Sequence, residues 1–577
     1  MKIDRQQATS SSALSAREVR SLSPLTASLA ALALAAAVFA IYSPALNFQF
    51  ILDDHHFLND PRLQESGHLW EYFTSYVWAQ VTGGPLSFYR PIFALWLRLN
   101  FILAGASSWG WHFLSIAKHM SVAVLLGFLT WKLLRDCLAA LLAAALFALH
   151  PAQTESVAWV TVPDPLMSVA VLSTLLLYLT YLDRISADRR TGAATKPRKR
   201  AAGKSDEDFS FLWLIASSVT CLAALMAKET AIVLPAVLAA LALTIPLQKP
   251  ARQKEKSDRP SLGIRLRAAL RQSLPFFGVT VVYLLVRLNA LGGRISPPTQ
   301  HLPLRTVLLS SPATLWFYIK VLLWPVQPRA FADPELASAF SVQAVLLPAL
   351  GVLCTVALLA WFCLWAWKKA QHDFPIEETT GIERALLLGS LILVLPILLA
   401  LNLNALNPGD FLHGRYTYLP LTGLMLLLAS AWHLLKKSRL IFFAAAAAVA
   451  IAFIVLTVRQ EGQWKDDLTV FTVARQYAPH NAPVAQNLAR THVQQALSLD
   501  EAGQCDQAIP IFRQAIQQYP QDWFAWAGLG ECLFKLNDLA GSEQSLRRAA
   551  ELSHEPRVVE QWQHLRAKMG LPPVPSP

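Results

Sequence analysis

The apolar stretch from Leu25 to Tyr42, LTASLAALALAAAVFAIY, sets the fold class of this chain because similar stretches recur along most of its length. It is longer than the apolar core of a signal peptide, which runs to about 7–15 residues. No clear small-residue cleavage site follows it. A helix that crosses a bilayer needs about 20 mostly apolar residues. The stretch therefore predicts a membrane anchor that is retained.

The composition indicates a polytopic, all-α membrane protein. Of 577 residues, 54% are hydrophobic and only 15% are charged, against about 25% charged in soluble domains; the mean hydropathy is +0.38. Two apolar runs, 90–104 and 304–326, contain Arg98 or Lys320 and could either cross or lie along the surface. Eleven other runs are expected to span the membrane: 24–43, 111–132, 137–150, 166–182, 211–227, 230–247, 273–290, 342–367, 385–405, 417–435 and 440–457.

The distribution of Lys and Arg predicts the topology. Dense basic segments at 183–208 and 249–271, with smaller ones at 368–369 and 436–439, belong on the cytoplasmic face by the positive-inside rule. An even number of spans separates these segments only if 90–104 and 304–326 do not cross. Residues 1–23 then form a cytoplasmic tail, 24–457 the membrane domain, and 458–577 an outer domain. The net charge of +12 indicates topology and contact with anionic lipid, and we expect no nucleic-acid partner.

The outer domain contains a repeat. Phe471-x2-Ala474-x4-Pro479 recurs as Phe512-x2-Ala515-x4-Pro520, and Trp526 opens a third unit. This spacing resembles tetratricopeptide repeats, in which helix pairs stack into a solenoid; the alternative is a generic pair of helical hairpins. Fewer than three full repeats are present, so we expect the array to lean on the membrane domain or on a partner. Cys505 and Cys532 could form a disulfide if this region lies outside the cytoplasm.

Polar motifs gather in the segments that the topology places on the outer face. Asp53 and Asp54 follow the first span in an aromatic-rich segment, where carboxylates are costly to desolvate. Such a pair could accept a proton, hold a metal ion, or cap a helix. The other motifs also have structural interpretations, such as a helix end at His150-Pro151. Their convergence on one face nevertheless favours an active site, and the residues are Arg90, His150, Glu155, Asp164, Lys228, Glu229, Arg415 and Tyr416.

The ordered motifs resemble those of the transmembrane and tetratricopeptide-repeat glycosyltransferases, relatives of the protein O-mannosyltransferases in the C-type (GT-C) superfamily. They are the acid pair, Tyr89-Arg-Pro91, His150-Pro-x3-Glu-x3-Trp159, Lys228-Glu-x-Ala231 and Arg415-Tyr-x-Tyr-Leu-Pro420, followed by the repeats. The resemblance implies a GT-C-like fold of about eleven spans with membrane-parallel helices in the first outer loop. It also implies a polyprenyl- or dolichyl-phosphate sugar as donor and a hydroxyl, often of protein Ser or Thr, as acceptor.

The resemblance also implies roles for residues. Asp53 or Asp54 would be the catalytic carboxylate, Asp164 with Glu155 would match a second acidic position, and Arg415 would lie near the donor phosphate. Lys228 and Arg90 are further phosphate-binding candidates, and His150, Glu229 and Tyr416 complete the candidate site. Relatives with repeats usually have Gly-Arg before the acidic residue that follows the His-Pro motif, whereas this chain has Val160-Thr-Val-Pro-Asp164. That departure affects the role of Asp164.

A carboxylate could take the proton of an acceptor hydroxyl while an arginine stabilises the departing phosphate, with inversion at the sugar carbon. The first loop has no Asp-x-Asp motif, which favours a mechanism without metal or other cofactor; the variant is a divalent ion held by Asp53, Asp54 and Asp164. The repeats would bind a polypeptide acceptor or dock another protein. The competing functions are a non-catalytic membrane-anchored scaffold and a transporter. The membrane would be the bacterial inner membrane, with the repeats in the periplasm, or the ER membrane, with the repeats in the lumen.

Overall fold

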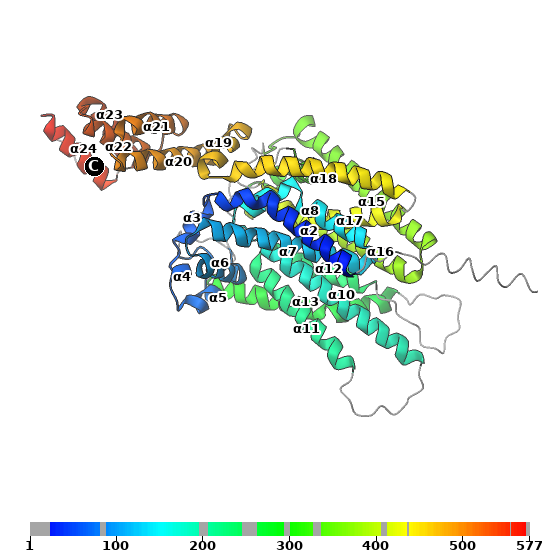
Figure 1. Cartoon of the computed structure of the whole chain (residues 1–577). Helices are drawn as coiled ribbons and strands as arrows, with labels where there is room; N and C mark the ends of the chain where they lie inside the picture. The colour runs from blue at the N-terminus through cyan, green and yellow to red at the C-terminus, as the bar shows by residue number, and fades with distance from the viewer. Residues whose placement is uncertain are drawn as a thin grey trace, which may run out of the picture.

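The computed structural model describes residues 24–80, 88–194, 206–244, 262–293, 301–326, 336–405, 412–435, 438–553 and 555–572. These residues form helices and connecting segments without a β-strand, which confirms the all-α fold class. Figure 1 shows a large helical bundle and, beyond one of its ends, a smaller group of helices from the C-terminal part of the chain.

The number of candidate spans agrees with the expectation, but one member differs: Leu304–Leu323 is counted, and the segment Glu229–Ala242 is too short to be counted. Ten of the described helices are long and apolar enough to cross a membrane, or eleven if the bent pair of Cys137–Ala148 and Pro151–Ala158 counts as one. The long helices include α2 (Pro24–Tyr42), α7 (Ser108–Leu134), α8 (Cys137–Ala148), α10 (Asp164–Ala194), α11 (Asp206–Ala227), α13 (Leu262–Ala290), α14 (Leu304–Leu323), α15 (Leu347–Asp373), α16 (Ile376–Leu399), α17 (Tyr418–Leu434) and α18 (Arg439–Glu461).

Two segments differ in length or placement from what their composition indicates. Of the span expected at 230–247, the described residues, which end at 244, form a 3-10 turn, η4 (Glu229–Val233), and the short helix α12 (Leu234–Ala242). It still reaches across the bundle, because Glu229 bonds Arg90 near the repeats while the Thr244 hydroxyl accepts from Arg384 at the other end. A buried helix can be shorter than one that faces lipid.

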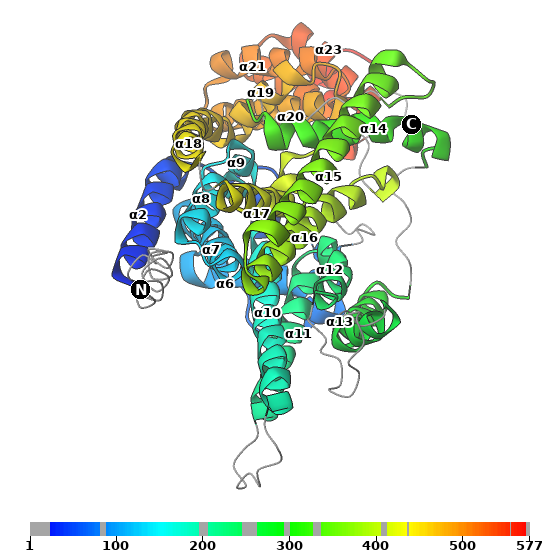
Figure 2. The ribbon, with the colours of Figure 1, turned by 90° about the vertical axis from the view of Figure 1, so that its right-hand side faces the viewer.

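By contrast, α14 is long enough to cross, but both of its ends bind the same end of the bundle. Leu302 N–H before the helix donates to Asn404 Oδ1 at 2.8 Å, and Leu322 C=O near its end lies 3.1 Å from His150 Nε2. Figure 2 accordingly shows α14 lying across the bundle near the repeats. These contacts agree with the expectation that 304–326 does not cross.

The described residues beside the segments predicted to be cytoplasmic lie together at the opposite end. Asp183 of α10 binds Lys132 of α7 and Arg384 of α16, each at 2.9 Å. His433 of α17 lies 3.1 Å from Asp136 and 2.9 Å from Glu378. Figure 2 places this end away from the repeats. The described residues that flank the two sets of loops thus lie at opposite ends, as the charge pattern predicts. Residues 1–23, 195–205, 245–261 and 436–437 lie outside the described residues, and the assignment of each end to a membrane face remains a prediction.

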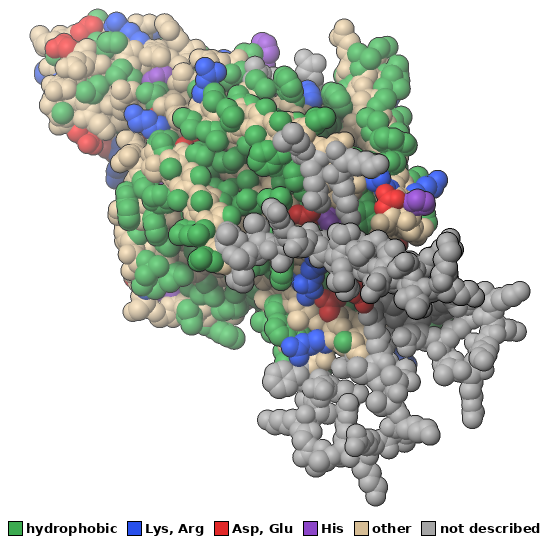
Figure 3. All heavy atoms as spheres, turned by 45° about the vertical axis from the view of Figure 1, so that its right-hand side comes forward, with side chains coloured by type: hydrophobic (Ala, Val, Ile, Leu, Met, Phe, Trp, Pro, Cys, Tyr) green, Lys and Arg blue, Asp and Glu red, His purple; other side chains and the backbone are tan. Residues whose placement is uncertain are grey.

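The sides of the bundle are apolar. Figure 3 shows hydrophobic side chains spread over the bundle and more charged side chains on the repeats. Large exposed apolar residues include Leu285 of α13, Leu358 of α15 and Ile441 of α18. Burial in lipid accounts for such a surface, since soluble monomers rarely expose contiguous apolar patches larger than a few hundred Å².

The first outer segment folds into short helices at the repeat end: α3 (Asp53–Leu58), α4 (Pro61–Gln64), α5 (Glu71–Thr74) and α6 (Pro91–Ala104). Asp60, directly before α4, forms a buried ion pair with Arg62 at 2.6 Å. Phe57, Tyr72 and Phe93 belong to the apolar core of this group of short helices. α6 is too short to be counted as a span, in agreement with the expectation for 90–104.

The C-terminal helices form antiparallel pairs: α19 (Asp467–Tyr477), α20 (Ala482–Glu501), α21 (Cys505–Gln518), α22 (Trp523–Lys535), α23 (Leu539–Ser553) and α24 (Pro556–Lys568). A Cβ on Gly528 would lie 2.4 Å from the Phe512 ring, so the close approach of α21 and α22 requires glycine there. As expected, the array leans on the membrane domain: Phe48, Ile51 and Trp159 share one apolar cluster with Trp464 and Phe471.

Candidate functional site

The acid pair begins α3, and its second member is deeply buried. Asp54 Oδ2 accepts from Ile51 N–H at 3.1 Å, while Oδ1 accepts from the hydroxyl and N–H of Thr161, at 2.6 and 3.2 Å. Burial raises the pKa of Asp54 to about 7, against the lowering effect of these bonds. Asp53 is only half-buried. Asp54 therefore fixes the loop, and Asp53 is the more accessible carboxylate.

The first repeat helix holds the same loop from the other side. Asp467 accepts from Leu52 N–H through Oδ1 and contacts His55 Nε2 through Oδ2, both at 2.9 Å. Leu52 has φ 53° and ψ −123°, a conformation that is strained for a residue with a side chain. The hydrogen bond to Asp467 raises the pKa of His55 and so favours its charged form. The repeats thus help to fix the backbone immediately before the acid pair.

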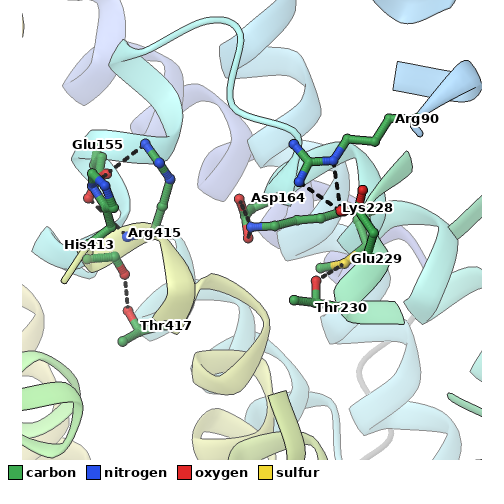
Figure 4. A network of polar contacts seen from close by, with 11 residues as sticks. Arg90, Glu155, Asp164, Lys228, Glu229, Thr230, His413, Arg415 and Thr417 are labelled. Atoms are coloured by element: carbon green, nitrogen blue, oxygen red, sulfur yellow. Dashed lines mark hydrogen bonds and ion pairs between the residues drawn. The ribbon is translucent and has the colours of Figure 1, made fainter. Parts of the chain in front are cut away.

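Glu155 organises the segment that contains Arg415. Its Oε1 lies 3.1 Å from His413 Nδ1 and 3.4 Å from Arg415 Nη1, and its Oε2 accepts from Arg415 N–H at 3.0 Å. A Cβ on Gly414 would lie 3.1 Å from Glu155 Oε2, so a glycine at this position lets the carboxylate approach the backbone. The motifs around residues 155 and 415 are therefore joined, as Figure 4 shows.

Asp54 and Arg415 meet the same short stretch of chain. The Arg415 guanidinium carbon lies 4.4 Å from the centre of the Trp159 ring, a cation–π distance. Asp54 binds Thr161, only two residues further along the chain. The structure thus brings the acid pair and the arginine to one place.

Two more ion pairs lie beside Arg415 in Figure 4. Lys228 Nζ is 2.6 Å from both oxygens of Asp164, and both side chains are buried. Arg90 binds Glu229 Oε2 through Nε at 2.9 Å and Nη2 at 2.7 Å. Burial lowers the pKa of Lys228, and the charge of Asp164 opposes this effect. Each of the three cations therefore faces a carboxylate.

Accessibility distinguishes the cations. The exposed fraction of the side chain is 15% for Arg90 and 16% for Arg415, compared with 6% for Lys228. Two buried polar atoms beside them, Trp159 Nε1 and Glu229 Oε1, have no hydrogen-bond partner among the described residues. Buried polar groups are normally paired, so these atoms are candidates for contact with a bound molecule or water.

The remaining candidates have different surroundings. His150 uses both ring nitrogens on the backbone: Nδ1 accepts from Ala152 N–H and Nε2 lies against Leu322 C=O. It therefore caps a 3-10 turn, which matches the structural interpretation of His150-Pro151. The Tyr416 ring is 4.9 Å from Lys228 Nζ and 5.6 Å from the Arg415 guanidinium carbon, which places it between these cations.

The metal variant at Asp53, Asp54 and Asp164 stays a prediction. Within the described residues, the one group of three His, Cys, Asp or Glu side chains with metal-ligand spacing is Asp500, Cys505 and Cys532 in the repeats. Asp53, Asp54 and Asp164 are not brought together in this way. Sequence reasoning also missed Thr161 and Asp467; both are ordinary polar residues, and only folding shows that they hold the acid loop.

Comparisons with known proteins agree with the motif-based resemblance. The tetratricopeptide repeat family model matches residues 493–555. Human protein O-mannosyl-transferase TMTC3 is 24% identical, with 89% of this chain and 54% of that protein covered. Human TMTC1 is 26% identical, with 87% and 56% covered, and human TMTC4 is 25% identical, with 76% and 61% covered. The chain is a distant homologue of these proteins, and it spans about half the length of the first relatives it matches.

Among solved structures, two are of an oligosaccharyltransferase from Archaeoglobus fulgidus, one in the apo form and one in complex with an inhibitory peptide and a dolichol-phosphate. Both are 13% identical, and each match covers 78% of this chain and 58% of the other. The TM-scores are 0.36 and 0.38.

Proposed function

We propose that this protein is a membrane glycosyltransferase that moves a sugar from a polyprenyl- or dolichyl-phosphate donor to an acceptor hydroxyl. The observation that carries the proposal is the meeting of the acid pair and Arg415 on residues 159–161, at the repeat end of an apolar bundle. The distant homology to protein O-mannosyl-transferases supports the same reaction class. Protein Ser or Thr is the proposed acceptor.

The donor phosphate would bind at the accessible arginines. Arg415 and Arg90 offer planar donor groups that can bind two phosphate oxygens together. Arg415 also holds its guanidinium over Trp159, which fixes its orientation. The greasy tail of the donor would lie along the apolar flank of the bundle. As the bond to the sugar breaks, negative charge grows on the phosphate, and these cations would stabilise it.

The acceptor hydroxyl would lose its proton to Asp53. Both carboxylate oxygens of Asp54 already accept hydrogen bonds from Thr161 and Ile51. Asp54 would therefore act as a positioning residue that holds the loop beside Asp53. Removal of the proton by a placed carboxylate contributes about 10²–10⁴-fold in rate. Attack from the face opposite the phosphate would invert the configuration at the sugar carbon.

The buried pairs would support these two groups. Asp164 neutralises Lys228, and both side chains are buried. The pair would support the Tyr416 ring, and Asp164 would not act as a second accessible acid. Glu155 holds the backbone of Arg415 in place. Glu229 would orient the Arg90 guanidinium group through their ion pair and leave part of that group available to the donor phosphate. In this scheme the departure from the family pattern at Val162-Pro163 would affect the support given by the Asp164–Lys228 pair more than the chemical step.

The repeats would present the acceptor polypeptide above the acid loop. α19 packs against Phe48, Ile51 and Trp159, so a polypeptide held by the array would lie near the carboxylate. Solenoids of this type bind extended chains on a concave face. If the array instead docks a partner protein, its removal would leave transfer to a short free acceptor peptide intact.

The test uses purified full-length protein in nanodiscs with a panel of lipid-linked sugars and peptide acceptors. We expect transfer by the wild type, loss of at least about 100-fold with Asp53→Asn, and a smaller loss with Asp54→Asn. Asp538→Asn, at an exposed repeat position, is the matched control. Unchanged transfer in both acid variants would exclude the carboxylate role, and no transfer from any lipid-linked sugar by wild type would favour a scaffold.

A further inference from the structure

A compact polar cluster lies inside the repeat array, away from the candidate site. Asp500, near the end of α20, has 8% of its surface exposed and accepts through Oδ1 from the thiols of Cys505 and Cys532, at 2.9 and 3.1 Å. Lys535 Nζ lies 2.9 Å from Oδ1 and 2.8 Å from Oδ2. The two sulfur atoms lie within 4.8 Å of each other. Three successive helices thus meet at one carboxylate.

We propose that Cys505 and Cys532 are joined by a disulfide bond in the mature protein. The bond would connect the first residue of α21 to the last turn of α22. Two S–H bonds break and one S–S bond forms, and the two protons and two electrons pass to the disulfide of a thiol oxidoreductase or of oxidised glutathione, which becomes two thiols. Compartments outside the cytosol supply such oxidants, and the charge-derived topology places the repeats there.

The chemistry of the cluster favours this pair over the other cysteines. Cys137, Cys221, Cys354 and Cys363 lie on helices of the membrane bundle. Cys505 and Cys532 are buried, lie on adjacent antiparallel helices and share one acceptor. Burial raises the pKa of Cys505 and so slows attack by its thiolate once the helices have packed. Oxidation therefore belongs to the period before α21 and α22 close over Asp500.

Asp500 gives the bond a distinct property. It stabilises the reduced form through two S–H hydrogen bonds, which oxidation removes, while Lys535 still neutralises the carboxylate. Stabilisation of the dithiol makes a disulfide easier to reduce. The bond would thus fix the packing of two neighbouring repeat helices under oxidising conditions and open under mild reduction.

The first experiment measures the oxidation state in native membranes. Cells are lysed directly into denaturant that contains excess N-ethylmaleimide, so that buried free thiols are blocked as well. The protein is then reduced and labelled with a heavier maleimide for peptide mass spectrometry. We expect the heavy label on Cys505 and Cys532 and the light label on Cys221. In the Cys505→Ser variant, Cys532 should carry the light label. Light label on both cysteines of the wild type would overturn the proposal.

The second experiment measures stability without any assay of sugar transfer, so its outcome is independent of the proposed function. Dithiothreitol should lower the melting temperature of the wild-type repeat array by at least about 5 °C and leave a Cys505→Ala, Cys532→Ala double variant unchanged. Equal behaviour of the two proteins would contradict the bond. One equivalent of zinc in the isolated wild type, absent from the double variant, would instead assign the cluster to a metal and overturn the proposal.

Discussion

At the scale of single residues, the environment of Asp54 has a measurable consequence for stability. Burial raises its pKa from 3.8 to about 7, although hydrogen bonds from Thr161 and Ile51 oppose the change. The folded protein therefore binds a proton at this site in a pH range where the unfolded chain has released it. Stability from this group is fully present below the unfolded pKa and is lost as pH rises through about 7.

Asp54→Asn should flatten the dependence of stability on pH. Between pH 5 and pH 8 we expect the melting temperature of the wild-type membrane domain to fall, by an amount that corresponds to a few kcal/mol at most, and that of the variant to fall less. His55 has a raised pKa of the same sign, chiefly through its hydrogen bond to Asp467, which both proteins keep. The charge of Asp54 adds a smaller effect on His55, so His55→Gln in both backgrounds separates the two groups. Parallel curves for the two proteins would contradict the buried, proton-binding carboxylate.

Arg415 provides a second test at this scale, because its contacts depend on the shape of the guanidinium group. It lies over Trp159 and bonds Glu155, and lysine would keep the charge but lose the planar fork. We expect Arg415→Lys to lower kcat/KM for the lipid-linked donor by about 10–100-fold, which corresponds to about 1.4–2.8 kcal/mol. The control is Arg490→Lys on the exposed surface of the repeats. A normal donor dependence in Arg415→Lys would remove Arg415 from the phosphate site.

At the scale of elements, apolar runs and loop charges predicted most of the fold. The exception in length is α12, which begins with a 3-10 turn and Pro235 near its start and is shielded from lipid by its neighbours. α14 shows why composition alone is insufficient: a helix lying across the bundle can be as apolar as one that crosses it. The prediction that 304–326 does not cross came from the even number of spans required between the basic loops, and not from hydropathy.

The contact between α19 and the acid loop could not be predicted, because Asp467 and Leu52 are 415 residues apart. Asp467→Ala should release Leu52 N–H and the strained turn before the acid pair. We expect faster hydrogen exchange at residues 50–56 and a drop in kcat of about 10-fold, on the order of 1–2 kcal/mol for the lost charge-assisted bonds. Asp467→Asn, which keeps an acceptor, should rescue part of the loss.

Asp466→Ala is the control for that experiment. Asp466 caps α19 by accepting from Thr469 N–H at 2.8 Å, and its removal costs about 1 kcal/mol of helix stability without a change at the acid loop. Equal exchange at residues 50–56 in Asp467→Ala and Asp466→Ala would show that the repeats do not position the loop.

At the scale of the whole molecule, the gathering of the candidate residues was predictable but their pairing was not. The topology alone placed the acid pair, Glu155, Lys228 and Arg415 at one end of the bundle. Whether Lys228 faces Asp164 or a substrate depends on side-chain packing, which a motif spacing does not encode. The burial of Asp54 beside a half-buried Asp53 likewise follows from the fold around Thr161.

The membrane orientation is the last prediction, and single cysteines in a cysteine-free chain can test it. Glu65→Cys and Arg547→Cys lie at the repeat end, and His372→Cys lies at the opposite end; all three native side chains are at least half exposed, at 69%, 52% and 88%. Because Lys and Arg in short loops are retained in the cytoplasm, an impermeant maleimide added from outside should label the first two and reach position 372 only after permeabilisation. External labelling at 372 without labelling at 65 would invert the molecule, and it would place the carboxylate loop where a lipid-linked sugar on the outer leaflet cannot reach it.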